Sequence, residues 1–173
     1  TNSDYVWYID PLDGTTNYAL NIPFFGCNIG LTYKNEPILG VVFNPLTKEL
    51  FIAEKNHGAK LNGKRIRVSK NSDMKKTLIN YCHVNVPDEI KVFEKLYFEL
   101  KTKGRDMRRL GSGGLDFCYV ACGRNDVYLR TGNPPWDIVA GYIIAKEAGA
   151  KITDWSGDEW KLNSKTLLVT NGK

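Results

Sequence analysis

The segment WYIDPLDGTTN, at residues 7–17, constrains this chain more than any other part of it. An apolar, aromatic run predicts a buried strand over Tyr5–Asp10, and the Pro, Gly and Thr residues that follow favour a turn that opens a helix or a loop. Asp10 and Asp13 therefore stand at the end of a strand, beside backbone N–H groups and the hydroxyl of Thr15. Hard carboxylate oxygens in such a place suit Mg²⁺ together with a phosphate group.

An isolated pair of aspartates three residues apart has a simpler interpretation, because Asp is common both in turns and at helix N-caps. The surrounding residues favour metal binding instead. Pro11 fixes its own φ, Gly14 allows the backbone to approach a ligand closely, and Thr15 adds a hydroxyl in the same turn.

Composition excludes several classes of protein. The chain has 173 residues, of which 42% are hydrophobic and 25% charged, as in ordinary globular proteins. No apolar run approaches the roughly 20 residues that span a bilayer, so we expect neither a membrane partner nor a signal peptide. The net charge is +5, and the basic cluster at residues 60–76 is interpreted as the solvated face of a hairpin, without the motifs of a nucleic-acid-binding protein.

The cysteines lack the paired spacing of a metal site, so we expect reduced core thiols, which fits the cytoplasm. They are Cys27, Cys82, Cys118 and Cys122.

The patterns predict an α/β fold, an α+β layered sandwich, in two regions. Residues 1–74 should form the metal-site strand and an antiparallel sheet, and residues 75–173 a C-terminal α/β region. The expected strands are Tyr5–Asp10, Gly26–Tyr33, Ile38–Asn44, Glu49–Glu54, a hairpin over Ala59–Val68, Thr77–Cys82, Asp106–Leu110, Asp126–Arg130, Lys151–Thr153 and Thr166–Thr170. The expected helices are Asp88–Lys103, Gly114–Ala121 and Trp136–Ala148.

Two further segments are candidates for the same site. Asp137 opens the strongest helical pattern in the chain, where a carboxylate either stabilises the helix dipole by roughly 0.3–1 kcal/mol or completes a metal cluster. The segment Gly111-Ser112-Gly113-Gly114 lies between a predicted strand and a predicted helix. Such a loop can bind a phosphate or a sugar hydroxyl, although any tight turn at that place also favours glycine.

In order and spacing, these segments resemble the signatures of the inositol monophosphatase family. Residues 7–17 are similar to its first signature, and residues 136–141 with 147–149 (WDIVAG and EAG) to its second. Residues 108–112 and 118–121 resemble the segment between them, and the resemblance covers essentially the whole chain. It implies the layered α/β sandwich that this family shares with fructose-1,6-bisphosphatase, and Mg²⁺-dependent hydrolysis of phosphate monoesters.

The resemblance also implies roles for individual residues. Asp10 would bridge two metal ions, Asp13 and Asp137 would hold the second, and the carbonyl of Leu12 would bind the first. The Thr15 hydroxyl would orient the attacking water. The implied substrate-binding residues are Gly14, Thr15, Gly111, Ser112, Gly113, Arg130 and Asp137. The implied cofactor is two or three Mg²⁺ ions, which Mn²⁺ or Ca²⁺ can replace.

The sequence departs from the family pattern at its start. Family members carry acidic residues upstream of the Asp-Pro-Leu-Asp motif that bind metal and activate water, and this sequence begins too late to contain them. We therefore expect either a fragment truncated at the N-terminus or a member that lost its catalytic base. The chain alone is expected to be at least about a hundredfold less active than an intact relative.

Arg130 is the second departure, since it stands where inositol-specific members tend to carry a Glu. An arginine there suits a second anionic group, as in archaeal members that act on both inositol phosphate and fructose-1,6-bisphosphate. We expect its side chain to face the mouth of the site. The alternative is a surface arginine paired with an acid.

The expected function is therefore that of a cytoplasmic, Mg²⁺-dependent phosphatase, a homodimer whose partner is a small-molecule sugar phosphate such as inositol-1-phosphate or fructose-1,6-bisphosphate. A 3′-phosphoadenosine 5′-phosphate phosphatase shares the metal motif and is the alternative enzyme. A non-catalytic family member that acts as a binding protein is the alternative from another class.

Overall fold

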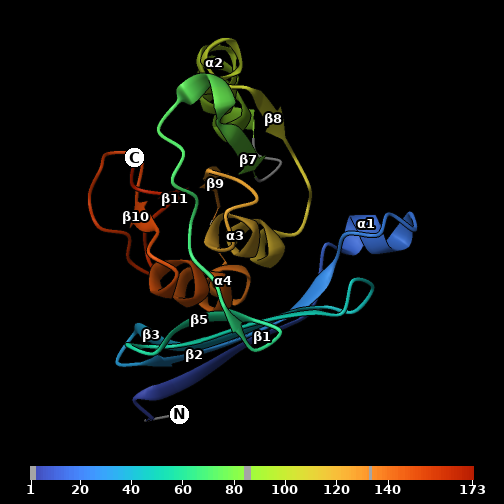
Figure 1. Ribbon diagram of the computed structural model, residues 1–173, viewed down its shortest axis with the longest axis vertical. Coiled ribbons are helices and arrows are strands. Elements are labelled where there is room, and N and C mark those ends of the chain that lie inside the picture. Colours follow the sequence, from blue (N-terminus) through green and yellow to red (C-terminus); the bar gives the residue numbers. More distant parts are fainter. Residues whose placement is uncertain (1–2, 84–86, 133) are drawn as a thin grey trace.

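The computed structural model describes residues 3–83, 87–132 and 134–173, and it is built from two β-sheets with two helices between them (Figure 1). One sheet has the strand order β1-β2-β3-β4-β5-β6 and the other the order β10-β11-β9-β7-β8. The first sheet contains β1 (Tyr5–Asp13), β2 (Gly26–Tyr33), β3 (Glu36–Asn44), β4 (Glu49–Glu54), β5 (Gly58–Leu61) and β6 (Lys64–Arg65). The second contains β7 (Leu78–Cys82), β8 (Asp106–Arg108), β9 (Val127–Thr131), β10 (Lys151–Thr153) and β11 (Thr166–Thr170).

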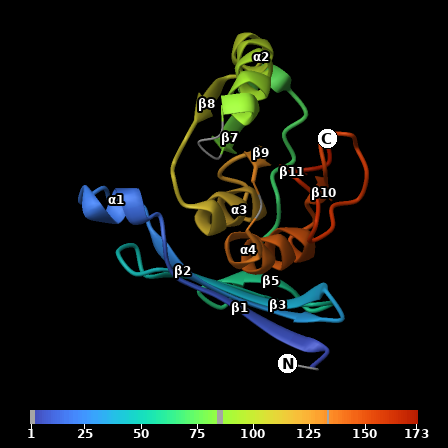
Figure 2. The same cartoon turned by 180° about the vertical axis from the view of Figure 1, so that it is seen from behind.

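The six-stranded sheet is an antiparallel meander, as the sequence predicts. Its turns use residues that tolerate a positive φ. Asn62 and Gly63 join β5 to β6 with φ values of 46° and 78°, and this was the predicted hairpin turn. The short helix α1 (Thr15–Ala19) follows β1 at the end of the sheet away from the N-terminus (Figures 1 and 2).

Helices α3 (Gly113–Ala121) and α4 (Pro135–Glu147) form the layer between the sheets, and both views agree on this arrangement (Figures 1 and 2). Helix α4 lies against the inner face of the six-stranded sheet because two strands lack side chains there. An ideal Cβ at Gly30 would lie 2.6 Å from Val139 Cγ1, and one at Gly40 would overlap the carbonyl oxygen of Ala140. The glycines thus set how closely the helix approaches the sheet.

The main hydrophobic core joins both predicted regions. Phe51 of β4, Phe117 of α3, Ile143 of α4 and Leu167 of β11 belong to one buried cluster. The predicted division at residues 74/75 therefore separates the strands of the two sheets, while the core between the sheets is shared.

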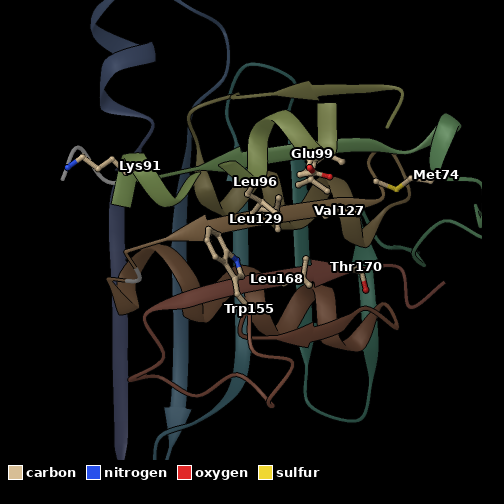
Figure 3. Close-up of a pocket in the computed structure, with 11 residues that line it drawn as sticks. Met74, Lys91, Leu96, Glu99, Val127, Leu129, Trp155, Leu168 and Thr170 are labelled. Carbon is tan, nitrogen blue, oxygen red and sulfur yellow. The ribbon is translucent and has the colours of Figure 1, made fainter. Parts of the chain in front are cut away.

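Helix α2 (Pro87–Lys103) covers the other face of the five-stranded sheet, where β7 runs parallel to both β8 and β9. Phe93 of α2 packs there with Ile79, Met107 and Leu129. Beside this cluster is an apolar cavity of about 760 Å³, walled by Trp155 and by leucines of α2 and the sheet (Figure 3). Asp10, Asp13 and Asp137 do not line it, so it is separate from the predicted metal site.

The prediction of a buried strand over Tyr5–Asp10 is wrong in two respects. The strand continues to Asp13, and Tyr5, Trp7 and Ile9 are 56%, 57% and 59% exposed. Strand β1 is an edge strand, and these alternate residues point away from α4. Side chains on that face of the strand stay exposed in the described structure, however apolar they are.

The other predicted boundaries are exact or lie within two residues of those observed, except that β6 is shorter than the expected hairpin arm. Gly149 ends α4 with φ of 95°, as the sequence predicts.

The four cysteines are free thiols. Within the described residues, none of the helices has both the length and the apolar character needed to cross a membrane.

The glycine contact between β3 and α4 gives a first testable prediction. Gly40→Ala should lower the free energy of unfolding by about 1–3 kcal/mol, because the new methyl group overlaps the backbone of α4 and the helix must move. Urea unfolding measures the loss. Gly104→Ala is the control, since its ideal Cβ would lie 3.2 Å from the nearest atom, and it should lose much less. Equal stability of Gly40→Ala and the parent chain would contradict the packing argument.

Candidate metal and phosphate site

A β-bulge brings Asp10 and Asp13 to the same face of β1. In a regular strand, residues three apart point to opposite faces. Here Asp10 pairs with Asn28 of β2 but Asp13 pairs with Gly26, so three steps along β1 match two along β2. One extra residue is accommodated, and both carboxylates point toward the helical layer. Leu12 lies within the bulge, and its N–H donates to Asp10 Oδ1 at 3.0 Å.

Gly14 makes the turn from β1 into α1. Its φ of 93° belongs to the left-handed region, and an ideal Cβ would lie only 3.1 Å from the carbonyl oxygen of Phe24. A glycine is therefore required both by the backbone angle and by the close approach. Thr15 follows as the exposed first residue of α1, so its hydroxyl and N–H lie at the helix start, as predicted.

Asn17 fixes this turn against the Gly111 loop. Its side-chain Nδ2 donates to the carbonyl oxygens of Phe24 at 2.6 Å and Leu110 at 2.7 Å. Gly111 itself has φ of 88° and lies next to the Asn17 amide. Sequence reasoning included Asn17 in the signature but gave it no role. Because its buried amide donates two hydrogen bonds, Asn17 is identified as a positioning residue.

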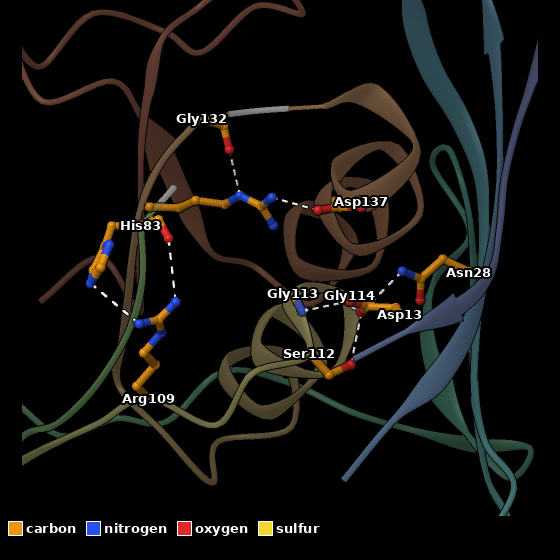
Figure 4. Close-up of polar contacts among 10 residues, drawn as sticks. Asp13, Asn28, His83, Arg109, Ser112, Gly113, Gly114, Gly132 and Asp137 are labelled. Carbon is orange, nitrogen blue, oxygen red and sulfur yellow. Dashed lines mark hydrogen bonds and ion pairs between the residues drawn. The ribbon is translucent and has the colours of Figure 1, made fainter. Parts of the chain in front are cut away.

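Asp13 is almost fully buried and accepts four hydrogen bonds (Figure 4). The Ser112 hydroxyl donates at 2.8 Å, the Gly113 and Gly114 N–H groups at 3.1 and 2.7 Å, and Asn28 Nδ2 at 3.1 Å. Ser112 and Gly113 were predicted to bind substrate. In the structure these two residues donate to the carboxylate of Asp13, because the loop opens α3 beside the β1 bulge, and their role in substrate binding stays a prediction.

Asp137 lies in the first turn of α4 and forms an ion pair with Arg130 of β9 (Figure 4). Arg130 Nη2 is 2.5 Å from Asp137 Oδ2, and Arg130 Nε donates to the carbonyl of Gly132 at 2.7 Å. The Arg130 side chain is only 5% exposed. Arg130 is therefore buried and neither faces an open mouth nor lies on the surface, while its pairing with an acid is as the alternative predicted, and its role in substrate binding stays a prediction.

The three aspartates come together in space. Burial raises the pKa of Asp10 from 3.8 to about 6; the negative charges of Asp13 and Asp137 and a side-chain hydrogen bond with Asp137 add to the increase. Burial also raises the pKa of Asp13, while its bonds from Ser112, Gly114 and Asn28 act in the opposite direction. A divalent cation would relieve this mutual repulsion.

The oxygen ligands suit a hard cation, although they do not form a preformed coordination site. In the described part of the chain, no group of three or more His, Cys, Asp or Glu side chains is arranged to hold a metal ion. Asp13 Oδ1 accepts one hydrogen bond, from Gly113, and the ion pair of Asp137 uses Oδ2. Both carboxylates, with Asp10, are the oxygen ligands that Mg²⁺ prefers. The residues present therefore fit such an ion if Asp13 and Asp137 bind it while they keep their present hydrogen-bond and ion-pair partners.

Sequence reasoning missed Asn28, and it named Gly114 only as part of the glycine loop; both donate hydrogen bonds to Asp13. An ideal Cβ at Gly114 would lie only 2.2 Å from Asn28 Oδ1. The absence of a side chain at Gly114 therefore leaves space for the Asn28 amide. Only the β1–β2 register places Asn28 opposite Asp10, and no local sequence pattern signals it.

Comparison with known proteins agrees with this geometry. A model of the inositol monophosphatase family matches residues 1–173. The chain is 40% identical over 172 residues to inositol monophosphatase 2 of Solanum lycopersicum, and the match covers 95% of this chain and 63% of that protein. It is 38% identical over 172 residues to Nus factor SuhB of Pasteurella multocida, covering 97% and 63%. The chain thus spans about 63% of the length of these curated relatives.

Solved structures give the same result. The structure of inositol monophosphatase from Anabaena matches with a TM-score of 0.92 and 38% identity, over 99% of this chain and 69% of that one. A protein described as an inositol monophosphatase-fructose 1,6 bisphosphatase matches with a TM-score of 0.85 and 35% identity, over 99% and 67%. Signature residues, layered fold and family model all agree, and the chain belongs to the inositol monophosphatase family.

Proposed function

We propose that this protein is a Mg²⁺-dependent phosphate monoester hydrolase that acts on sugar phosphates. The observation that carries the proposal is the convergence of Asp10, Asp13 and Asp137 beside the left-handed turn at Gly14. Membership of a phosphatase family supports the reaction class. The names of an inositol monophosphatase and of an inositol monophosphatase-fructose 1,6 bisphosphatase among similar proteins support inositol-1-phosphate and fructose-1,6-bisphosphate as substrates.

In this proposal the three aspartates and the carbonyl of Leu12 would hold Mg²⁺, and Asp10 would contribute to the binding of both ions. Bound Mg²⁺ would neutralise the carboxylates, activate water and stabilise the leaving oxygen. The backbone N–H groups of Gly14 and Thr15 bind phosphate oxygens at the start of α1, and the Thr15 hydroxyl orients the attacking water. Asn17 keeps this turn in place through its two carbonyl contacts.

A second candidate function is binding without catalysis. Its support is the similarity to a relative named Nus factor SuhB, which is nearly as high as that to the plant inositol monophosphatase. A 3′-phosphoadenosine 5′-phosphate phosphatase is the other enzyme to consider, because it shares the metal motif.

A phosphate-release panel tests the reaction. The full-length protein should release phosphate from inositol-1-phosphate or fructose-1,6-bisphosphate when Mg²⁺ is present, and EDTA should stop the release. Asp10→Asn should abolish turnover, because the amide removes the charge that holds both ions. Release only from 3′-phosphoadenosine 5′-phosphate would select the alternative enzyme. Absence of Mg²⁺-dependent release from all three compounds would favour the binding protein.

The role given to Thr15 has its own test. Thr15→Ala should lower kcat by at least about tenfold and change KM much less, since orienting the water matters mainly in the transition state. Steady-state kinetics on the preferred substrate separate the two constants. Thr16→Ala is the matched control, because Thr16 is the next exposed residue of α1, and it should behave like the parent protein. Equal effects of both substitutions would contradict the role of the Thr15 hydroxyl.

The raised pKa of Asp10 predicts how the metal-free protein responds to pH. Above about pH 6 the folded state carries a carboxylate that its surroundings disfavour, and this destabilisation disappears as the pH falls toward 3.8 and the group binds its proton. In EDTA, Asp10→Asn should therefore raise the Tm at pH 8 and leave it unchanged near pH 4. Thermal unfolding at the two pH values measures the difference. A lower Tm for Asp10→Asn at pH 8 would rule out carboxylate repulsion as the cause.

A further inference from the structure

Arg130 brings a positive charge into the group of carboxylates. Its guanidinium contacts Asp137 Oδ2 through Nη2, at 2.5 Å, and the carbonyl of Gly132 through Nε, at 2.7 Å. The side chain of Asp137 is 19% exposed and that of Arg130 only 5% exposed. The pair is therefore largely screened from water, where an ion pair has far more influence than on the surface.

Several parts of the fold hold this guanidinium in place. In the sheet, Arg130 lies between Cys82 of β7 and Leu167 of β11. On the helix side, an ideal Cβ at Gly113 would lie 2.5 Å from Arg130 Nη1. A larger residue at this first position of α3 would require the guanidinium to move. The position of Arg130 is thus fixed by packing as well as by its charge.

Charge counting shows what the arginine does to the site. Asp10, Asp13 and Asp137 together carry three negative charges when ionised, and Arg130 offsets one of them. Its ion pair is with Asp137, whereas Asp13 accepts its hydrogen bonds from neutral donors. A divalent cation that binds Asp137 must share that carboxylate with a fixed positive charge.

We propose that Arg130 is an internal counter-cation of the metal site, which holds Asp137 in place in the metal-free protein and weakens the binding of a divalent cation there. This inference rests on the proposed metal-dependent function. It makes Arg130 a positioning residue, and it replaces the sequence-based expectation that this arginine receives a second phosphate of the substrate.

Mn²⁺ binding to the full-length protein tests the proposal without using turnover. Arg130→Gln and Arg130→Met should each bind Mn²⁺ at least about tenfold more tightly than the parent protein, because the competing charge is gone. Arg130→Lys, which keeps the charge, should stay within about threefold of the parent. Arg124→Gln is the matched control, since Arg124 forms a similar ion pair with Glu49 of β4, and its Mn²⁺ affinity should not change.

A thermal cycle in EDTA tests the contact itself. Arg130→Met should lower the Tm of the metal-free protein, and saturating Mn²⁺ should stabilise this variant by more degrees than it stabilises the parent. In an Asp137→Asn background, Arg130→Met should have a much smaller effect on both Tm and Mn²⁺ affinity. If Arg130→Met changed Tm and Mn²⁺ affinity as much in the Asp137→Asn background as in the parent protein, the arginine would act through packing, and the proposal would be wrong.

The outcomes separate the inference from the function on which it rests. If the parent protein binds Mn²⁺ but both neutral variants bind it equally or more weakly, Arg130 is not a counter-cation, while the proposed hydrolase stands. If the parent protein binds no Mn²⁺, the metal-dependent function fails, and Arg130 with Asp137 is then a structural ion pair only.

Discussion

Repulsion among carboxylates is the constraint on which the site and much of its surroundings depend. Asp10, Asp13 and Asp137 meet where β1 ends and α4 begins, and each is compensated differently. Neutral donors surround Asp13, and an arginine pairs with Asp137. Asp10 accepts a hydrogen bond from the N–H of Leu12, and its pKa is raised, as is that of Asp13. The repulsion that remains within this group of carboxylates therefore favours a bound cation.

The same contacts connect the layers of the fold. The bonds to Asp13 join β1 of the six-stranded sheet to the start of α3, and the ion pair joins β9 of the five-stranded sheet to the start of α4. Hydrophobic burial between the sheets supplies most of the driving force for this arrangement. The polar contacts decide how the helix starts are oriented over the strand ends. Chemistry and architecture thus share a small set of side chains.

The features that could be predicted from the sequence are those that depend on the local backbone preferences of individual residues. The turn at Asn62 and Gly63 and the end of α4 at Gly149 follow from residues that tolerate positive φ, and both were found where expected. The family signatures correctly indicated the fold and family. The convergence of the three aspartates also agrees with the spacing argument, whereas their roles as metal ligands are still predictions.

The features that were not predictable depend on partners far away in the sequence. The exposure of Trp7 depends on which face of an edge strand is covered, and its aromatic sequence context carries no information about that. The direction of Arg130 depends on the position of α4, and the bonds to Asp13 depend on Asn28 across the sheet. In each case the residue type indicated a charge or a hydrogen-bond donor. Which group it contacts is determined only by how the layers of the fold pack together.

The β-bulge has a consequence for which changes of sequence length the site can tolerate. Asp10 and Asp13 share a face of β1 only because one residue is accommodated between the pairs with Asn28 and Gly26. Deleting one residue between the aspartates would leave a regular strand in which the two carboxylates, then two residues apart, still share a face and Asp13 keeps Gly26 as its partner, but the bulge that contains Leu12 would be lost. The loop around Gly157, in contrast, has open space around it and can vary in length. In this strand, the number of residues between the two aspartates therefore sets the backbone position of Leu12 rather than the face to which the carboxylates point.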